Sequence, residues 1–173
     1  MELIKSVIRE IPDFPKPGIL FYDITPVLAD PAAFDRVIDL LEARARELDV
    51  EAVVGMESRG FLFGAPLALR LGVPFVPVRK AGKLPYKTES ASYALEYGEA
   101  TIEIHQDALK PGQKTLIVDD LLATGGTAAA TIDLVQRLGA VVATCMFVIE
   151  LGGLGGRAKL PAGKVESLIS YED

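Results

Sequence analysis

Residues 118–139, VDDLLATGGTAAATIDLVQRLG, decide the fold because they follow directly on a strand-like run and contain a tight loop and a helix. The expected strand covers residues 114–118, and its residues 115–118 are apolar and mostly β-branched, which is typical of a buried strand. Residues 127–138 carry apolar side chains at helical spacing, and a glycine follows them as a helix stop. A strand followed at once by a helix predicts an α/β protein with a parallel sheet.

The rest of the chain alternates in the same way. The sequence therefore predicts one α/β domain over residues 1–173, with a central, mostly parallel sheet flanked by helices. Asp30 before a proline is a good helix cap, and Gly72 is the expected stop of a helix over residues 61–71. The expected helices are 3–11, the segment from 31, and 61–71; the expected strands are 50–55, 73–78 and 141–149; and residues 91–105 alternate as a hairpin around 97–99.

Composition excludes several functional classes. The chain has 173 residues, and half are apolar, but no run is long and uncharged enough to span a bilayer. Its net charge of −6 argues against nucleic acid as a partner. One cysteine and one histidine argue against a disulfide, a cysteine metal cage and a Ser-His triad. Residues 1–6 lack the basic start of a signal peptide, so we expect a soluble cytoplasmic protein without a membrane partner.

The loop before the helix has the composition of an anion-binding site. Free backbone N–H groups and the positive end of a helix favour a phosphate there, and glycines let the backbone approach it closely. The loop lacks the Gly-Lys-Ser/Thr ending of a P-loop and the Gly-x-Gly-x-x-Gly dinucleotide pattern. The candidate phosphate ligands are Ala123, Thr124, Gly125, Gly126 and Thr127.

Two acids, Asp119 and Asp120, stand just before this loop, where they would repel a phosphate. An ionised carboxylate accepts hydrogen bonds, and the vicinal hydroxyls of a ribose donate them well. A ribose 5-phosphate therefore suits both parts, with its hydroxyls on the acids and its phosphate on the loop. The alternative is a capped helix preceded by acids in a solvated turn.

The run VDDLLATGGT resembles the phosphoribosyl-pyrophosphate signature of type I phosphoribosyltransferases. Residues 11–28, 55–68, 79–85 and 92–98 are similar to blocks of the adenine-specific members of that family, in the same order. The resemblance implies the type I phosphoribosyltransferase fold, with a small hood from about 1–30 and 150–173 and a flexible hairpin loop at about 80–97. It also implies transfer of the 5-phosphoribosyl group from 5-phosphoribosyl 1-pyrophosphate to adenine, which gives AMP and pyrophosphate.

A second strand-to-helix loop contains Glu57, Ser58 and Arg59. Its N–H donors and guanidinium group can hold a pyrophosphate. The resemblance implies a cis peptide between Glu57 and Ser58, and a contact of the Arg59 backbone N–H with the base. The alternative is a surface helix cap.

Arg79, Lys80, Lys83 and Lys87 form a basic cluster without an intervening acid. Several positive charges near one polyphosphate can offset the charge of the leaving group. The alternative is a solvated charged loop. The resemblance implies that this segment closes over the reacting centre, and that Arg79 or Lys80 of a homodimer reaches the neighbouring subunit's site.

Glu96 and Tyr97 lie at the expected hairpin turn. The resemblance places Glu96 near the imidazole ring of the purine, where a carboxylate can relay the base proton, and Tyr97 near the pyrophosphate. An exposed hairpin glutamate is the alternative. Arg59 and Lys83 complete the expected catalytic set, and His105, at the far end of the hairpin, is interpreted as structural.

A flat purine needs an apolar slot with a few backbone hydrogen bonds. The resemblance implies that Phe21 stacks on adenine, that the Leu20 backbone and Arg59 bind its edge, and that Leu151 makes an apolar contact. As residues alone, the three apolar ones are more typical of a core. Tyr22 stands where relatives carry a basic residue.

The resemblance also implies Mg²⁺ as cofactor, brought in largely by the substrate and held by Asp119 and Asp120 through water. Two other functions stay open at this stage. One is a phosphoribosyltransferase for xanthine, hypoxanthine or guanine. The other is a regulator that binds 5-phosphoribosyl 1-pyrophosphate without catalysis.

Overall fold

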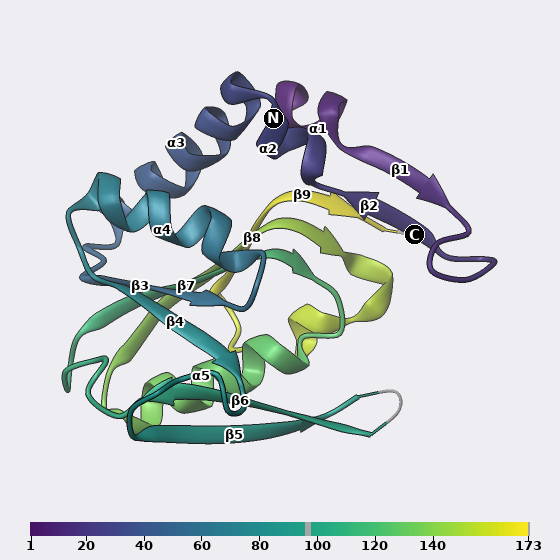
Figure 1. Cartoon of the computed structure of the whole chain (residues 1–173). Helices are drawn as coiled ribbons and strands as arrows, with labels where there is room; N and C mark the ends of the chain where they lie inside the picture. The colour runs from purple at the N-terminus through teal and green to yellow at the C-terminus, as the bar shows by residue number, and fades with distance from the viewer. Residues whose placement is uncertain (96–97, 173) are drawn as a thin grey trace.

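The computed structural model describes residues 1–95 and 98–172. Within them, seven strands form a sheet in the order β5-β6-β4-β3-β7-β8-β9 (Figure 1). Its strands are β3 (Ala52–Met56), β4 (Phe75–Lys80), β5 (Thr88–Ala94), β6 (Glu99–His105), β7 (Lys114–Leu122), β8 (Val141–Leu151) and β9 (Val165–Tyr171). The five strands from β4 to β9 are parallel, whereas β5 and β6 form an antiparallel hairpin on one edge. This confirms the expected mostly parallel sheet and the hairpin.

Strands β3 and β7 form the centre of the sheet, as their apolar sequences predict. Every residue of β3 is buried, which a strand covered on both faces requires. Gly55 pairs with Val118, so the two strands end at the same edge. The loops that follow them are therefore neighbours in space, although they are far apart in the sequence.

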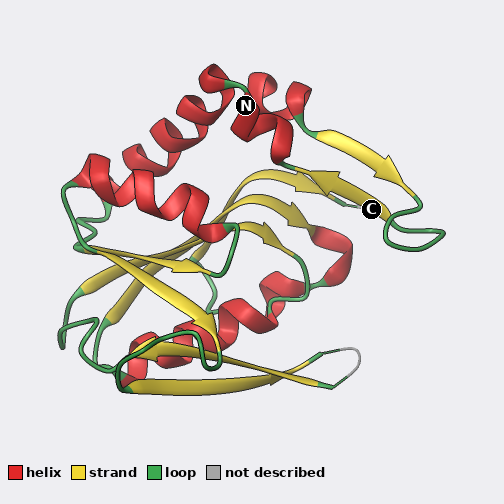
Figure 2. Ribbon diagram, viewed as in Figure 1, coloured by secondary structure: helices red, strands yellow, loops and turns green. Residues whose placement is uncertain are grey.

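Helices cover both faces of the sheet (Figures 1 and 2). Helix α5 (Gly126–Arg137) lies on one face, and α1 (Glu2–Val7), α2 (Thr25–Ala29), α3 (Pro31–Glu47) and α4 (Gly60–Leu71) lie on the other. Alternate residues of β7 pack on opposite sides, as the period of a strand dictates. Ile117 belongs to the core on the α5 side, whereas Leu116 and Val118 belong to the core beneath α3 and α4. Among the described residues, no helix has both the length and the apolar character needed to cross a bilayer.

The helix boundaries follow the predicted signals. The Asp30 carboxylate accepts hydrogen bonds from the backbone N–H groups of Ala32 and Ala33, at 2.9 and 3.1 Å, and so caps α3. Gly72 ends α4 with a left-handed φ of 68°. The cap and the stop expected from the sequence are both confirmed.

The first helix is shorter than predicted. Helix α1 ends at Val7, and the chain continues as β1 (Arg9–Pro12), which pairs antiparallel with β2 (Leu20–Asp23). Ile11 therefore lies opposite Phe21 in a two-stranded sheet and not on a helix. The helical spacing of its apolar residues was misleading, because pairing with a distant strand outweighs the weak propensity of one short helix.

Strand β7 is longer than predicted. It continues past Val118 to Leu122, because β8 extends to Leu151 and pairs with it through Leu121 and Ile149. Strand β9 and helix α2 were not predicted. Strand β9 carries Tyr171, which stacks on Tyr22 of β2 with ring centroids 3.9 Å apart, so the β1–β2 sheet lies beside the end of the main sheet.

Candidate active site

Among the described residues, three adjoining cavities lie at the edge where β3 and β7 end. The loop cavity, of about 90 Å³, is lined by the segment between β7 and α5. The acid cavity, of about 320 Å³, contains Asp119, Asp120, Arg59 and Lys80. The aromatic cavity, of about 450 Å³, contains Phe14, Phe21 and Tyr22. Asp119 lines the first two and Asp120 the last two, so the acid cavity lies between the loop cavity and the aromatic cavity.

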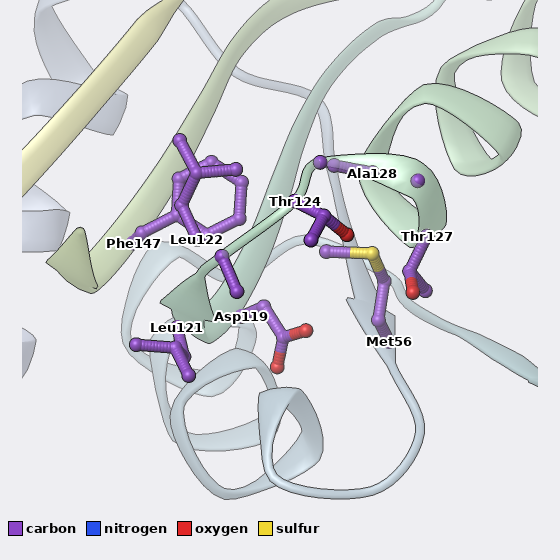
Figure 3. Close-up of a pocket in the computed structure, with 11 residues that line it drawn as sticks. Met56, Asp119, Leu121, Leu122, Thr124, Thr127, Ala128 and Phe147 are labelled. Atoms are coloured by element: carbon purple, nitrogen blue, oxygen red, sulfur yellow. The ribbon is translucent and has the colours of Figure 1, made fainter. Parts of the chain in front are cut away.

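The loop cavity has the geometry of an anion site. Gly125 adopts a left-handed φ of 76° and precedes the first turn of α5, whose N–H groups have no partners within the helix. The Asp119 carboxyl group and the hydroxyl groups of Thr124 and Thr127 surround this space in Figure 3. Glycine is required at position 125, because a Cβ atom there would lie 2.5 Å from the Gly156 carbonyl oxygen. The predicted phosphate ligands are therefore gathered around one cavity.

The two acids lie inside β7 and not in a turn after it, so the solvated-turn alternative is wrong. Asp120 is 4% exposed, and the Arg59 Nε lies 2.5 Å from its Oδ2. The Asp120 backbone N–H donates to Asp119 Oδ1 at 2.9 Å. Burial, together with the neighbouring Asp120 carboxylate, raises the pKa of Asp119 well above its ordinary value. Asp119 therefore retains its proton more readily than an isolated aspartate, while Asp120 is paired with Arg59. The two side chains together present carboxyl oxygens that can accept hydrogen bonds from sugar hydroxyls.

The loop after β3 contains the expected cis peptide between Glu57 and Ser58. The Glu57 carboxylate accepts hydrogen bonds from Arg79 Nε and Nη2, at 3.3 and 3.2 Å, and from the Lys80 backbone N–H at 2.9 Å. The Arg79 guanidinium lowers the pKa of Glu57 through this contact. The Glu57 side chain therefore fixes the start of the basic segment, and the loop offers its backbone and the Arg59 guanidinium to an anion.

The basic cluster is divided in this structure. Lys80 lines the acid cavity, whereas the Arg79 guanidinium is bound by Glu57 and donates to the Lys83 carbonyl oxygen at 3.3 Å. Lys83 and Lys87 are exposed and line none of the three cavities. The structure thus brings Arg59 and Lys80 to the acids, but not Lys83.

The aromatic cavity includes Phe21 but neither Leu20 nor Leu151. Leu20 is 38% exposed, and Leu151 packs against the core beneath α3 and α4. Phe14 meets Phe21 edge-on, with ring centroids 5.1 Å apart. Phe14, which was not among the predicted site residues, is half exposed and lines this cavity together with Phe21.

Two further predictions concern the hairpin. Glu96 and Tyr97 lie outside the described residues. His105 pairs with Thr88 at the end of the hairpin away from the tip, and its Nε2 accepts a hydrogen bond from the Tyr86 backbone N–H at 3.4 Å. This position agrees with a structural interpretation of His105.

Sequence reasoning missed two groups next to the loop cavity. Tyr93 of β5 reaches Thr127, and Arg157 is paired with the buried Glu150, beside the segment that touches Gly125. Neither carries a local signal, because both act through contacts with residues distant in the sequence.

Known proteins share this architecture and these motifs. The family model of the phosphoribosyl transferase domain matches residues 23–164. The chain is 58% identical to the adenine phosphoribosyltransferase of Carboxydothermus hydrogenoformans, over 97% of this chain and 99% of the relative. A crystal structure of adenine phosphoribosyltransferase from Thermoanaerobacter pseudethanolicus superimposes with a TM-score of 0.94 at 55% identity, covering 98% of this chain and 99% of that one.

The Saccharomyces cerevisiae enzyme gives a TM-score of 0.93 at 46% identity, over 96% of this chain and 97% of that chain. That structure contains adenine and an imino-altritol bisphosphate. The fold and the strand–loop–helix site are those of the phosphoribosyltransferases. Within that class, the chain belongs to the adenine phosphoribosyltransferase family.

Proposed function

We propose that the protein transfers the 5-phosphoribosyl group from 5-phosphoribosyl 1-pyrophosphate to adenine and releases AMP and pyrophosphate, a step of purine salvage. The order of the three cavities carries this proposal. The phosphate loop comes first, the acid cavity with its flanking cations second, and the aromatic cavity third. This is the order of the phosphate, the ribose and the purine in AMP. The names of the close relatives support adenine as the base.

The loop at residues 123–127 binds the 5-phosphate in this proposal. The N–H groups at the start of α5 and the hydroxyls of Thr124 and Thr127 are its donors. This binding energy is remote from the reacting carbon, so it serves to hold that carbon in place.

Asp119 and Asp120 bind the ribose hydroxyls. When the sugar binds, the Asp120 carboxylate accepts hydrogen bonds from the ribose hydroxyls in place of its ion pair with Arg59. The Arg59 guanidinium is then free to bind the pyrophosphate. Glu57 and Ser58 contribute backbone groups to the pyrophosphate site, together with Arg79, Lys80, Lys83 and Tyr97. Since Lys83 is exposed, its role requires the segment at about 80–97 to close over the ligand.

Phe21 stacks on adenine, while the Arg59 and Leu20 backbones bind the edge of the base and Leu151 contacts its face. Leu20 and Leu151 lie outside the aromatic cavity, so the hood from about 1–30 and 150–173 must tighten around the base. Adenine N9 attacks the anomeric carbon as its bond to pyrophosphate breaks, and Glu96 takes the proton of the base.

Departure of pyrophosphate ahead of attack gives the transition state oxocarbenium character. The protein then contributes mainly by holding the two reactants in line and by neutralising charge on the leaving group. Arg59 and Lys80, which already flank the acids, are suited to this second task.

Mg²⁺ is the proposed cofactor. No cluster of three His, Cys, Asp or Glu side chains that could hold a metal occurs in residues 1–95 and 98–172. The carboxyl groups of Asp119 and Asp120 offer the oxygen donors that Mg²⁺ prefers, so they fit an ion that arrives with the substrate and is held through water. When bound, the ion supplies neutralisation of the pyrophosphate charge.

Purified protein incubated with adenine, 5-phosphoribosyl 1-pyrophosphate and Mg²⁺ tests the proposal, with AMP and pyrophosphate measured by chromatography. We expect AMP to form, and adenine to outcompete hypoxanthine, guanine and xanthine. Preference for another of these bases would assign the enzyme to that purine. Binding of the phosphoribosyl donor without any turnover would favour the regulator instead.

We also propose that the protein is a homodimer and works in the cytoplasm. Helix α4 exposes Leu62 and Leu69, at 43% and 83%, and a surface of this kind supports association with a second copy. Imaging of a fluorescent fusion in intact cells would test the location.

A further inference from the structure

Tyr93 connects the β5–β6 hairpin to the phosphate loop. Its hydroxyl oxygen lies 2.8 Å from Thr127 Oγ1. Its ring lies over Gly126, where a Cβ atom would approach Tyr93 Cδ2 to 2.8 Å. Tyr93 also lines the acid cavity and packs against the core on the α5 side. One side chain therefore touches two members of the phosphate loop from a different element.

Strand β5 is tied to α5 at both ends of the helix. Near the start of α5 the tie is the Tyr93–Thr127 contact, and near its end Arg137 Nη1 donates to the Ser90 carbonyl oxygen at 2.8 Å. These contacts fix the part of β5 from Ser90 to Tyr93 relative to the phosphate loop. Only two residues of described chain, Ala94 and Leu95, separate Tyr93 from residues 96–97.

The hydroxyl groups of Tyr93 and Thr127 can adapt to a bound phosphate without a shift of their oxygen atoms. Each hydroxyl has one proton and can also accept a hydrogen bond. In the structure Thr127 donates to Tyr93. If Tyr93 instead donates to Thr127, the Thr127 proton is free to point at a phosphate oxygen, and both oxygen atoms keep their places. Tyr93 thereby orients the one loop hydroxyl that lines both the loop cavity and the acid cavity.

We propose that Tyr93 is a positioning residue for the 5-phosphate, which acts through Thr127 and Gly126 and links the hairpin to the occupancy of the phosphate loop. This inference rests on the proposed function of that loop. A residue that only packs would need the ring but not the hydroxyl, so the two roles separate in the Tyr93→Phe variant.

The test measures KM for each substrate, kcat, and binding of ribose 5-phosphate by calorimetry. For Tyr93→Phe we expect KM for 5-phosphoribosyl 1-pyrophosphate and Kd for ribose 5-phosphate to rise about three- to tenfold, the effect of one lost hydrogen bond. KM for adenine should change less than twofold. Ser92→Ala is the matched control, because it removes a 2.8 Å hydroxyl pair with Thr101 in the same hairpin, and it should leave both values unchanged.

A double-mutant cycle with Thr127→Val tests the route of the effect. If Tyr93 acts through Thr127, the double variant should bind ribose 5-phosphate no more weakly than Thr127→Val alone. If Thr127→Val melts at a much lower temperature than the wild type, Thr127→Ser is used in its place. Because serine keeps the hydroxyl, Tyr93→Phe in the Thr127→Ser background should weaken binding of ribose 5-phosphate as much as it does in the wild type.

Two outcomes would overturn the inference. One is a Kd for ribose 5-phosphate in Tyr93→Phe within twofold of the wild type. The other is full additivity in the cycle, which would mean that Tyr93 contacts the ligand directly. A wild-type protein that neither binds ribose 5-phosphate nor forms AMP would contradict the proposed function itself, so the two failures are distinguishable.

Discussion

Asp120 lies where the acid and aromatic cavities meet, and its charge is paired with Arg59. Asp120→Asn keeps the shape of this side chain but removes its charge. We expect AMP formation to fall about 100-fold or more, as for other lost electrostatic contacts in active sites. The melting temperature should change little, because the substitution also removes the repulsion between Asp120 and Asp119.

The control for this prediction is Asp133→Asn, an acid of α5 that forms an ion pair with Arg137 away from the cavities. It should retain wild-type kinetics. Wild-type turnover in Asp120→Asn would contradict the assignment of Asp120 to the ribose.

Gly156 is a second residue on which the phosphate loop depends. A Cβ atom at this position would overlap the Ala123 carbonyl oxygen and approach the Gly125 backbone nitrogen to 2.9 Å. Gly156→Ala should therefore raise KM for 5-phosphoribosyl 1-pyrophosphate about tenfold, and should lower the free energy of unfolding by about 1–3 kcal/mol, a typical cost of overpacking.

The neighbouring Gly155→Ala separates crowding from backbone strain. Gly155 has a φ of 65°, but nothing lies within 4 Å of its Cβ position. The Gly155→Ala variant should lose about 1–2 kcal/mol of free energy of unfolding, because alanine is strained in the left-handed conformation. Its KM for 5-phosphoribosyl 1-pyrophosphate should equal that of the wild type. Equal KM values in the two variants would argue against contact with the loop as the cause.

At the scale of elements, an ion pair ties the short helix η2 (Gly156–Lys159) to two strands. Arg157 Nε donates to Glu150 Oε1 of β8 at 2.8 Å, and Arg157 Nη1 donates to the Val165 carbonyl oxygen of β9 at 2.7 Å. The Ser167 hydroxyl adds a bond of 2.6 Å to Glu150 Oε2. These contacts hold the segment that begins at Gly156, which lies against Ala123 and Gly125 of the phosphate loop.

This pair predicts a pH dependence of stability. The Arg157 hydrogen bond lowers the pKa of Glu150 below its ordinary value of 4.5. The stabilisation is therefore complete above that value and is lost as the pH falls through the lowered pKa. Glu150→Gln should reduce the free energy of unfolding by about 1–3 kcal/mol at pH 7, and the difference from wild type should shrink below pH of about 4.

Urea denaturation at both pH values measures this difference. Glu47→Gln is the control, since Glu47 makes an exposed pair with Arg44 and should change stability by less than about 0.5 kcal/mol. A Glu150→Gln effect that is equally small, or that grows toward acid pH, would contradict the prediction.

The basic segment after β4 is an element whose role requires movement. Lys83 is exposed and outside the cavities, so its contribution to pyrophosphate binding depends on closure of the segment. Lys83→Ala should lower kcat/KM for 5-phosphoribosyl 1-pyrophosphate about tenfold and leave adenine binding unchanged. Lys110→Ala, an exposed lysine near Pro111 and Gln113 and away from the cavities, should have no effect. Unchanged kinetics in Lys83→Ala would favour the solvated-loop alternative.

At the scale of the whole molecule, the exposed apolar face of α4 predicts association. Leu62 and Leu69 lie seven residues apart and so share one side of the helix. Light scattering after size exclusion should give twice the 18.5 kDa of one chain. Leu69→Glu should shift the mass to that of a monomer, and Val141→Glu, also at an exposed apolar residue but on β8, should not. A wild-type mass of one chain would contradict the dimer.

Local patterns predicted well where one segment decides its own structure. The cap at Asp30, the stop at Gly72 and the hairpin at β5–β6 were found because caps, left-handed glycines and alternation are properties of neighbouring residues. Ile11 was placed wrongly on a helix, because the apolar residues of 3–11 also fit helical spacing and nothing within that segment reveals that Ile11 pairs with Phe21 of β2. Of the candidate site, the phosphate loop and the acids were found, whereas Tyr93 and Arg157 were not.

The sequence by itself determined the strand, the loop and the helix around residues 118–139, and with them the family and the chemistry of the phosphoribosyl half. Hydrophobic period and a glycine turn are local, and they need no knowledge of the rest of the chain. The tertiary structure alone decided that Asp119 and Asp120 lie within a strand, that Arg59 pairs with Asp120, and that Tyr93 reaches Thr127 from 34 residues away. Such contacts depend on strand order and register, which the packing of the whole sheet sets.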